Sequence, residues 1–416
     1  MKSRILLSAS ILFAALASNA QDAGRTFAFT GDGNNDFMWM NIRQVDLNSG
    51  VVSKNLFERS KTNYSITNVE TKKVADQSAI ADGNIYVAST YPTATFVAAA
   101  AFDKRTDKLF FIPMRMNELR WVDVSARGAE PKFYSLSSSI LPAGPQNDEA
   151  ANITRMTIGA DGNGYAITND GNHLIRFTTG KKPVITDLGS LIDAEENKGI
   201  SVHNKCTSWG GDMVADAFGK LYIISANRHV FTVDIESRIA THTGTISGLP
   251  NGYTTNGAAV DDNGDIVVTS ANVFAGYYRV KLDGLTATQI EGSDIKYNAS
   301  DLANGNLLLQ KQADAARKFG SASDIRNESL AGNKVVPNPV TGSSFKLLLN
   351  GEVEGACNII LTDVAGRTIQ TTRANLVKGQ VQQNVNITRR PVAGTYLVKL
   401  VDAAGKVVLT DKLIIQ

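Results

Sequence analysis

The sequence predicts an all-β protein built from two domains, and three observations lead to this prediction. Short β-branched or apolar runs bounded by Gly, Asn or Asp recur along most of the 416 residues, which is typical of strands joined by turns. A degenerate motif of strand, Asp/Asn-Gly turn and strand repeats through the first three quarters of the chain. Helical periodicity is weak throughout, which argues against folds that alternate strands with helices.

The N-terminus has the pattern of a secretory signal peptide. A positive stretch, Met1–Arg4, precedes the apolar run Ile5–Leu16, and Ser18-Asn19-Ala20 forms a small-x-small cleavage site. We therefore expect residues 1–20 to be removed after Ala20. The apolar run is too short to span a bilayer, and no later segment is longer, so we predict no transmembrane segment.

The repeated motif occurs five times in the body of the chain. Its third, fourth and fifth copies follow at glycine spacings of 57, 45 and 41 residues, measured from Gly162 to Gly219, Gly264 and Gly305. Most copies are followed by a third strand and a fourth, outer strand. The five copies are Ala98–Ile112, Met156–Ile167, Met213–Ile224, Ala258–Val268 and Ala299–Leu309.

A four-stranded unit that recurs at this spacing predicts a β-propeller, in which each blade buries its faces against its neighbours. Six blades fit the length. We expect the sixth to be shared between the ends of the domain, with Met40–Leu47 and Val51–Phe57 as outer strands of the inner pair in Tyr297–Gln310. The propeller is predicted to occupy residues 21–311. Residues 312–334, mostly small and charged, are predicted to be a linker.

Composition excludes several classes of partner. The formal net charge is +2, and the signal peptide carries Lys2 and Arg4 without an acid, so the mature chain is near neutral. That balance gives no support for binding nucleic acid or anionic lipid. Cys206 and Cys357 fall in different predicted domains, and we expect both to be free and buried.

The last part of the chain, residues 335–416, predicts a small immunoglobulin-like β-sandwich. Six or seven short strands fill it. Two of its turns are near copies, Asp363–Arg367 and Asp402–Lys406. In each turn a glycine, Gly366 or Gly405, can supply the positive φ that a tight hairpin requires.

This segment resembles the type A C-terminal sorting domain of the type IX secretion system of Bacteroidetes. The resemblance covers about a fifth of the chain. It implies that the domain is read by the type IX secretion machinery, which takes the protein through the periplasm to the cell surface or extracellular space, and that the domain is usually cleaved. The motif residues in this sequence are Pro337, Asn338, Pro339, Asp363, Gly366, Arg367, Gly394, Tyr396 and Lys412.

No catalytic motif stands out in the body. A Gly-x-Ser-x-Gly nucleophile elbow and a phosphate loop are both missing from the sequence. Asp32–Asp36 is similar to a calcium loop but lacks the closing Glu, and we interpret it as a turn. We predict no catalytic residue and no cofactor, while calcium held by an acidic turn is left open. The four histidines are interpreted as structural or surface residues: His173, His203, His229 and His242.

The repeat alignment gives one candidate ligand site. With the repeat glycines as register, Arg155, Asp212, Gly257 and Asn298 occupy equivalent positions at the start of inner strands, and Trp209 and Asn256 lie close by. Polar side chains in one slot of several blades would surround a single pocket at the mouth of the channel. The alternative, that these residues only hold water in the channel, remains open.

Two classes of function fit these observations. The favoured one is a non-catalytic surface protein that binds an unknown peptide, glycan or protein. The alternative is a metal-dependent lyase or lactonase-like hydrolase with Glu149, Asn256 and Asp212 at the channel mouth. A propeller fold does not decide between them.

Overall fold

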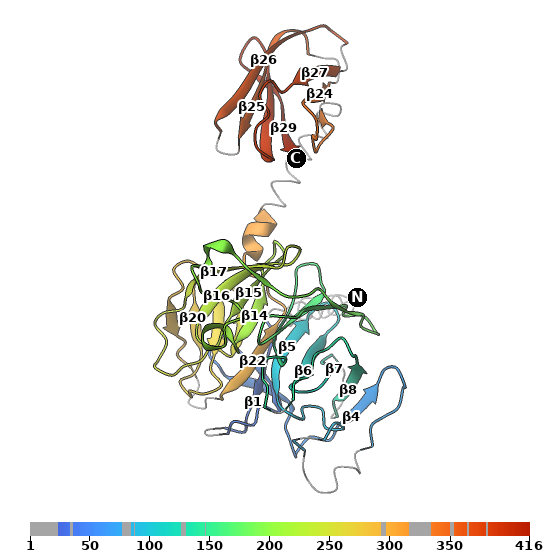
Figure 1. Ribbon diagram of the computed structural model, residues 1–416, viewed down its shortest axis with the longest axis vertical. Coiled ribbons are helices and arrows are strands. Elements are labelled where there is room, and N and C mark those ends of the chain that lie inside the picture. The colour runs from blue at the N-terminus through green and yellow to red at the C-terminus, as the bar shows by residue number, and fades with distance from the viewer. Residues whose placement is uncertain are drawn as a thin grey trace, which may run out of the picture. The chain divides into compact units, whose positions relative to one another are not determined.

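The computed structural model describes residues 24–315 and 334–416, apart from short gaps at 34–35, 77–84, 87, 126–129, 146, 293–296, 350–352, 364–365 and 380–381. The predicted signal peptide and most of the predicted linker lie outside these residues. The chain divides into two compact units, Met1–Ala313 and Asp314–Gln416. Each unit is described by itself, and the regular structure of both consists of strands with little helix (Figure 1).

The described strands of the first unit form five sheets, each with four antiparallel strands in a meander. Two sheets carry one extra outer strand that pairs in parallel, β4 (Ser65–Asn68) on β8 (Lys132–Ser137) and β13 (Ile192–Asp193) on β17 (Ile239–Thr245). The first sheet contains β22 (Ala299–Asn304), β1 (Thr26–Thr30), β2 (Asn41–Val45) and β3 (Val52–Phe57). The second contains β5 (Val97–Asp103), β6 (Lys108–Pro113), β7 (Glu118–Asp123) and β8 (Lys132–Ser137). The third contains β9 (Ile153–Ile158), β10 (Gly164–Thr168), β11 (Leu174–Phe177) and β12 (Ile185–Asp187). The fourth contains β14 (Asp212–Ala215), β15 (Lys220–Ile224), β16 (His229–Asp234) and β17 (Ile239–Thr245). The fifth contains β18 (Gly257–Val260), β19 (Ile266–Thr269), β20 (Tyr278–Val280) and β21 (Ala287–Gln289).

The five sheets are the blades of a β-propeller. Their innermost strands are neighbours in the cyclic order β22, β5, β9, β14, β18 and back to β22. Between each pair of neighbouring blades lies a separate cluster of buried apolar side chains, five clusters in all among the described residues. The propeller prediction is confirmed, but the count of about six blades is not, because the ring closes with five.

The missing sixth blade has a simple origin. β22 is both the fifth copy of the repeat and the inner strand of the shared blade, so counting it twice added a blade. Closure by the two ends of the domain is present as predicted, but Tyr297–Gln310 supplies one inner strand and not an inner pair. The second strand of the blade is β1, which pairs with β22 from Thr26 opposite Asn304 to Thr30 opposite Ala299. The first strand of the domain and the last one therefore lie side by side in one sheet.

Small residues allow the five inner strands to approach the axis. β5 contributes Ala99, Ala100 and Ala101, and β18 contributes Ala258 and Ala259, all buried. The cavity between the inner strands holds only about 10 Å³, which is too little for a ligand. We call the end of this channel where the inner strands begin the N-end, and the other end the C-end.

The repeated Asp/Asn-Gly turns lie at the C-end. In the β14–β15 turn, the Asp216 carboxylate accepts hydrogen bonds from the N–H groups of Phe218 and Lys220, both at 2.9 Å. Gly219 supplies the positive φ of 93°. Beyond β22 the chain crosses to this turn, where Leu308 accepts a hydrogen bond from Ala217 and is fully buried. The repeat in the sequence thus marks the C-end turns of the blades.

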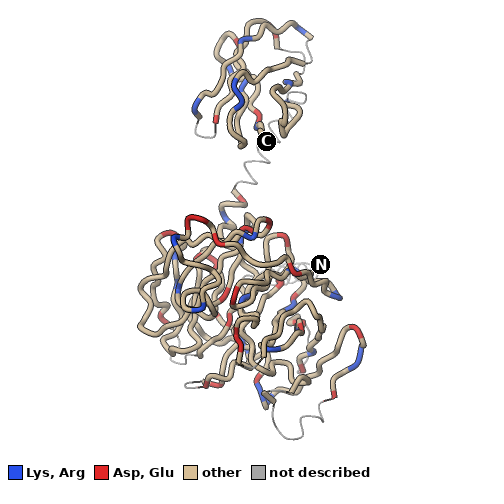
Figure 2. The backbone as a smooth tube through the Cα atoms, in the orientation of Figure 1, with Lys and Arg blue, Asp and Glu red and all other residues tan. Residues whose placement is uncertain are grey.

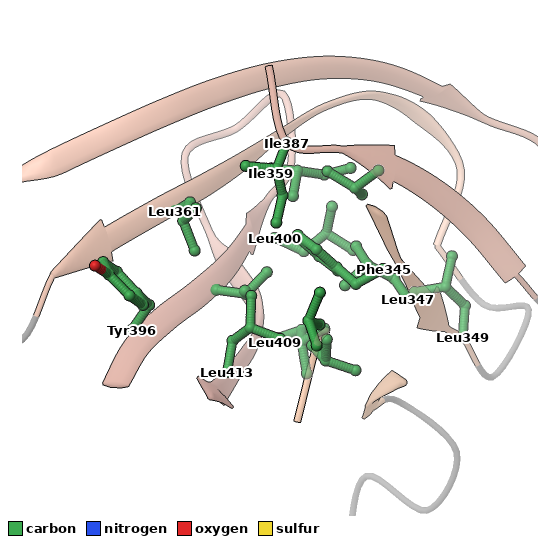
Figure 3. Close-up of a cluster of buried hydrophobic side chains, with 14 of the residues drawn as sticks. Phe345, Leu347, Leu349, Ile359, Leu361, Ile387, Tyr396, Leu400, Leu409 and Leu413 are labelled. Atoms are coloured by element: carbon green, nitrogen blue, oxygen red, sulfur yellow. The ribbon is translucent and has the colours of Figure 1, made fainter. Parts of the chain in front are cut away.

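The second unit is a β-sandwich, as predicted. One sheet contains β23 (Lys334–Val336), β24 (Ser344–Leu348) and β27 (Gln382–Asn386). The other contains β26 (Thr368–Leu376), β25 (Gly355–Asp363), β28 (Gly394–Val401) and β29 (Val407–Ile415). Alternate side chains of both sheets point inward and form one apolar core that includes Phe345, Leu361, Leu400 and Leu413 (Figure 3).

Candidate functional site

The four aligned residues all lie at the N-end of the channel. Arg155 is the third residue of β9, Asp212 begins β14, Gly257 begins β18, and Asn298 immediately precedes β22. Arg155, Asp212 and Asn298 are buried, with at most 2% of each residue exposed. They therefore lie inside the wall of the propeller rather than on its surface.

The Arg155 guanidinium binds backbone carbonyl groups. Its Nε and Nη2 donate to the Gly210 carbonyl at 3.1 and 2.9 Å, and Nη1 donates to the Thr168 carbonyl at 3.1 Å. Nη2 also donates to the carbonyl of Ser208. Burial lowers the pKa of Arg155 to about 10, although the charges of Asp212 and Asp170 act in the opposite direction. Arg155 thus ties the loop before β14 to the third blade.

Asp212 accepts hydrogen bonds from backbone N–H groups on three inner strands. Its Oδ1 accepts from Met213 in β14 at 2.7 Å, and its Oδ2 accepts from Ala258 in β18 at 2.6 Å and from Leu302 in β22 at 3.4 Å. Burial raises the pKa of Asp212 well above its ordinary value, and the backbone N–H groups and Arg155 only partly offset this effect. Asp212 therefore joins neighbouring blades.

Trp209 and Asn256 are the members of the predicted site that reach the surface, since both are half-buried. The Trp209 indole N–H donates to the carbonyl of His203 at 2.9 Å, and the Lys205 ammonium lies 5.1 Å from the ring centroid. Asn256 accepts from the N–H of Ala271 at 3.1 Å. These two side chains are accessible to a ligand. Arg155 and Asp212 are buried, so they could only support the position of the residues that contact it.

Asn298 has one satisfied and one unsatisfied polar atom. Its Nδ2 donates to the Ala271 carbonyl at 2.6 Å, while its buried Oδ1 has no partner among the described residues. Glu149, named for the enzymatic alternative, lies in the loop before β9, where its carbonyl accepts from Asn169 at 2.9 Å. The described residues contain no group of three or more His, Cys, Asp or Glu side chains that could hold a metal ion.

The other candidates from the sequence have local roles. His173 pairs with Asp187 at 2.7 Å, and His203 contacts the Asp170 carbonyl. His229 and His242 lie 3.1 Å apart, from Nδ1 to Nε2, a contact that the sequence did not indicate. Both cysteines are free as predicted, but only Cys357 is buried. Cys206 is exposed because α2 (Lys205–Ser208) lies on the surface at the N-end.

A larger hollow lies at the C-end, where no site was predicted. This pocket of about 620 Å³ has Leu282, Leu307 and Leu309 among its lining residues, together with charged residues that are mostly exposed. The charged lining residues are Lys104, Asp261, Asp262, Asp265, Lys281, Asp283 and Lys311. They come from four separate stretches of the chain, so no motif of fixed spacing could have indicated them.

Charge is spread evenly over the molecule. Figure 2 shows acidic and basic residues interspersed along the chain, in agreement with the near-neutral composition. Among the described residues, no helix is long and apolar enough to cross a membrane.

Comparison with known proteins identifies the second unit. Residues 334–416 match the family described as Secretion system C-terminal sorting domain. No curated protein sequence matches the chain. Similar solved structures include PorZ, a surface component of the type-IX secretion system of Porphyromonas gingivalis, which is 14% identical with a TM-score of 0.32 over 95% of this chain and 53% of that chain. This chain thus spans about half the length of PorZ.

Two further structures are similar at the same low level. A putative 6-phosphogluconolactonase from Bacteroides uniformis is 10% identical, with a TM-score of 0.33 over 88% of this chain and 100% of that chain. The WD40 β-propeller domain of Doa1 is 12% identical, with a TM-score of 0.32 over 67% of this chain and 95% of that chain. Identities and scores this low carry no argument about activity.

The fold and the C-terminal match define the class of protein. It is an all-β protein that ends in a sorting domain, and this domain directs export to the cell surface or extracellular space. Residues 334–416 are, more particularly, a sorting domain of the type IX secretion system, which confirms the resemblance drawn from the Pro337–Pro339 and Asp363–Arg367 motifs.

Proposed function

We propose that this protein is a secreted or cell-surface binding protein whose propeller recognises a peptide segment of a partner protein at the C-end pocket. The observation that carries the proposal is the pocket itself. Its volume of about 620 Å³ falls within the range of roughly 300–1,000 Å³ that is common for ligand sites. The sorting domain supports the surface location in which such recognition would operate.

The lining of the pocket favours a peptide. Leu282, Leu307 and Leu309 offer an apolar area for one or two apolar side chains. Lys104 and Lys281 at the rim form no ion pair with any described residue, so their ammonium groups remain available to a carboxylate or a carbonyl oxygen. Asp283, on the same rim, can accept hydrogen bonds from peptide N–H groups. A peptide is the ligand class that offers apolar side chains, carbonyl oxygens and N–H groups together, and it therefore matches all three features of the pocket.

The N-end surface around Trp209 and Asn256 is the competing site for the same function. Arg155, Asp212 and Asn298 would support it from inside the wall.

The N-end and the C-end can be compared directly by selecting peptides from a random display library against the full-length protein. We expect Leu309→Asp and the double variant Lys104→Ala, Lys281→Ala to weaken the selected peptides at least tenfold, and Trp209→Ala or Asn256→Ala to leave them unchanged.

Several results would contradict this proposal. If Trp209→Ala abolishes binding while Leu309→Asp does not, the N-end is the site. If a glycan array gives saturable binding and the peptide library gives none, the ligand class is wrong. Repeating the measurement with calcium and with a chelator tests whether calcium takes part in binding. Metal analysis of the purified protein tests the lyase or lactonase-like alternative.

A further inference from the structure

Two carboxyl groups meet in the closed centre of the propeller. Asp301 in β22 and Asp212 in β14 are both fully buried, and their side chains lie close enough to interact through a hydrogen bond. Asp301 uses Oδ2 to accept from the N–H of Ala100 in β5 at 3.0 Å. Its Oδ1 has no donor from the described part of the protein.

Two carboxylates cannot hydrogen-bond to each other, because both are acceptors. A proton between them turns the repulsion into a hydrogen bond. Two buried carboxyl groups that are in contact do not both ionise, because their negative charges would repel each other. We propose that Asp212 and Asp301 hold one proton between them, and that this acid–carboxylate pair is a pH-sensitive closure of the propeller ring.

The charges around the pair are consistent with one proton shared by Asp212 and Asp301. Arg155 of β9 is the cation that faces Asp212, and Asp170 acts on Arg155 from the far side. From β5 and β18 the pair meets the backbone N–H groups of Ala100 and Ala258. One buried cation balances one carboxylate, which leaves the second carboxyl to remain neutral. Burial and the charge of Asp212 raise the pKa of Asp301 well above its ordinary value.

The pair lies where the ring closes. Through Asp212 it joins β14 to β18 and β22, and through Asp301 it joins β22 to β5. β22 is the strand that joins the last part of the domain to the first. Loss of the proton would place two buried negative charges at this junction, so the ring should be held more tightly in mildly acidic than in alkaline surroundings.

The sign of the pH effect follows from the raised pKa. The folded protein keeps a proton that the unfolded chain releases above the ordinary Asp pKa of 3.8, so stability falls as the pH rises from that value towards the folded pKa. Because one proton is involved, the unfolding equilibrium constant should rise roughly tenfold per pH unit in this window.

Asp301→Asn tests the proposal with little change in shape. The amide can still accept from Ala100 and can donate to Asp212 without an added proton. All three tryptophans lie in the propeller, so tryptophan fluorescence of the full-length protein during urea unfolding reports on this unit alone. We expect the ratio of the unfolding constants, wild type over Asp301→Asn, to rise roughly tenfold per pH unit between pH 5 and 7.

Asp216→Asn is the matched control. It removes a buried carboxylate that accepts from two N–H groups and the Tyr222 hydroxyl, so its ratio to wild type should stay constant over the same window. If Asp301→Asn fails to fold, infrared spectroscopy of the wild type decides, because a carboxylic acid carbonyl band should persist at pH 7. A pH-independent ratio, or a wild type without that band, overturns the proposal. Stability that depends on added calcium instead of pH also overturns it, since the pair would then hold a cation.

Discussion

The side chain of Asn338 is hydrogen-bonded to the backbone of Ile414. Its Oδ1 accepts from the Ile414 N–H at 2.8 Å, and its Nδ2 donates to the Lys412 carbonyl at 2.5 Å. Asn338 is the centre of the Pro337–Pro339 motif, and both partners belong to β29. The motif at the start of the sorting domain and the strand at its end are therefore one structural element, although 76 residues separate Asn338 from Ile414.

Asn338→Ala should loosen the last strand. Two hydrogen bonds are lost, each with a net contribution of about 1 kcal/mol, so the free energy of unfolding of the sorting domain should fall by about 1–2 kcal/mol. Hydrogen exchange of the β29 amides in the full-length protein measures this change. Asn375→Ala, on the exposed face of β26, is the control and should leave β29 unchanged. Equal exchange in both variants would show that the Asn338 contacts are not important.

Deletion of Lys406–Gln416 should block export beyond the outer membrane and leave cleavage after Ala20 intact. The deletion removes β29, which pairs with β28 along its length and contributes Leu409, Leu413 and Ile415 to the core. An exposed strand edge and an open core would remain. Fractionation and surface proteolysis of cells check the outcome, with Thr410→Ala, exposed on β29, as the control. Normal surface display of the truncated protein would contradict the role of the sorting domain.

Asp212→Ala should destabilise the propeller by about 1–3 kcal/mol, because buried N–H groups in β18 and β22 lose their acceptor. Arg155 also loses its facing carboxylate. Urea unfolding followed by tryptophan fluorescence measures the loss. Asp123→Ala is the control, since Asp123 caps Ser125 at the end of β7, away from the channel axis. A loss as large in the control as in Asp212→Ala would refute the claim.

The histidine pair predicts a second pH effect of opposite sign. Burial, aided by the charge of His242, lowers the pKa of His229 from its ordinary value of 6.5, and burial also lowers the pKa of His242. Groups with a lowered pKa support the fold above pH 6.5 and lose that support as the pH falls. When the pH falls from 6.5 to 5, the free energy of unfolding of His229→Asn should decrease less than that of the wild type. Urea unfolding at each pH measures this change. Thr288→Asn, exposed on β21, should retain the wild-type dependence.

The two units should fold independently, because each has its own apolar core. Residues 21–313 and 334–416 produced separately should each unfold in one cooperative transition, detected by circular dichroism. The intact chain, melted under the same conditions, is the reference for both. Two pieces without any cooperative transition would mean that the division at Ala313 is wrong.

The sequence predicted the parts of this structure that depend on local pattern. The turn at Asp216–Gly219 and the motif at Asp363–Arg367 both follow from residues close together in the chain. The blade count could not be obtained in this way, because Ala299–Leu309 reads as a repeat whether or not it shares a sheet with β1. The parallel strands β4 and β13 were also missed. Each is very short and pairs with a strand far away in the sequence, so no repeating pattern marks it.

In the candidate site, too, the sequence predicted what depends on local pattern and missed what depends on long-range contacts. The glycine register placed Arg155 and Asp212 at the channel, but it could not show that both are buried. It missed Asp301, which lies three residues beyond Asn298 and faces Asp212 only after the ring closes. An acid within a run from Ala299 to Ala303 whose other residues are small or apolar was the available signal.

The closure of the ring by β22 and β1 has a consequence for synthesis. A ribosome makes the three outer strands of the shared blade first and their inner strand last, so a growing chain carries an incomplete blade until residue 304 has emerged. The sorting domain is made only after that point. Every chain that carries the sorting domain therefore already contains the strand that completes its propeller, whereas a chain that ends before β22 lacks both. Export directed by the sorting domain is thus confined to chains in which the propeller sequence is complete.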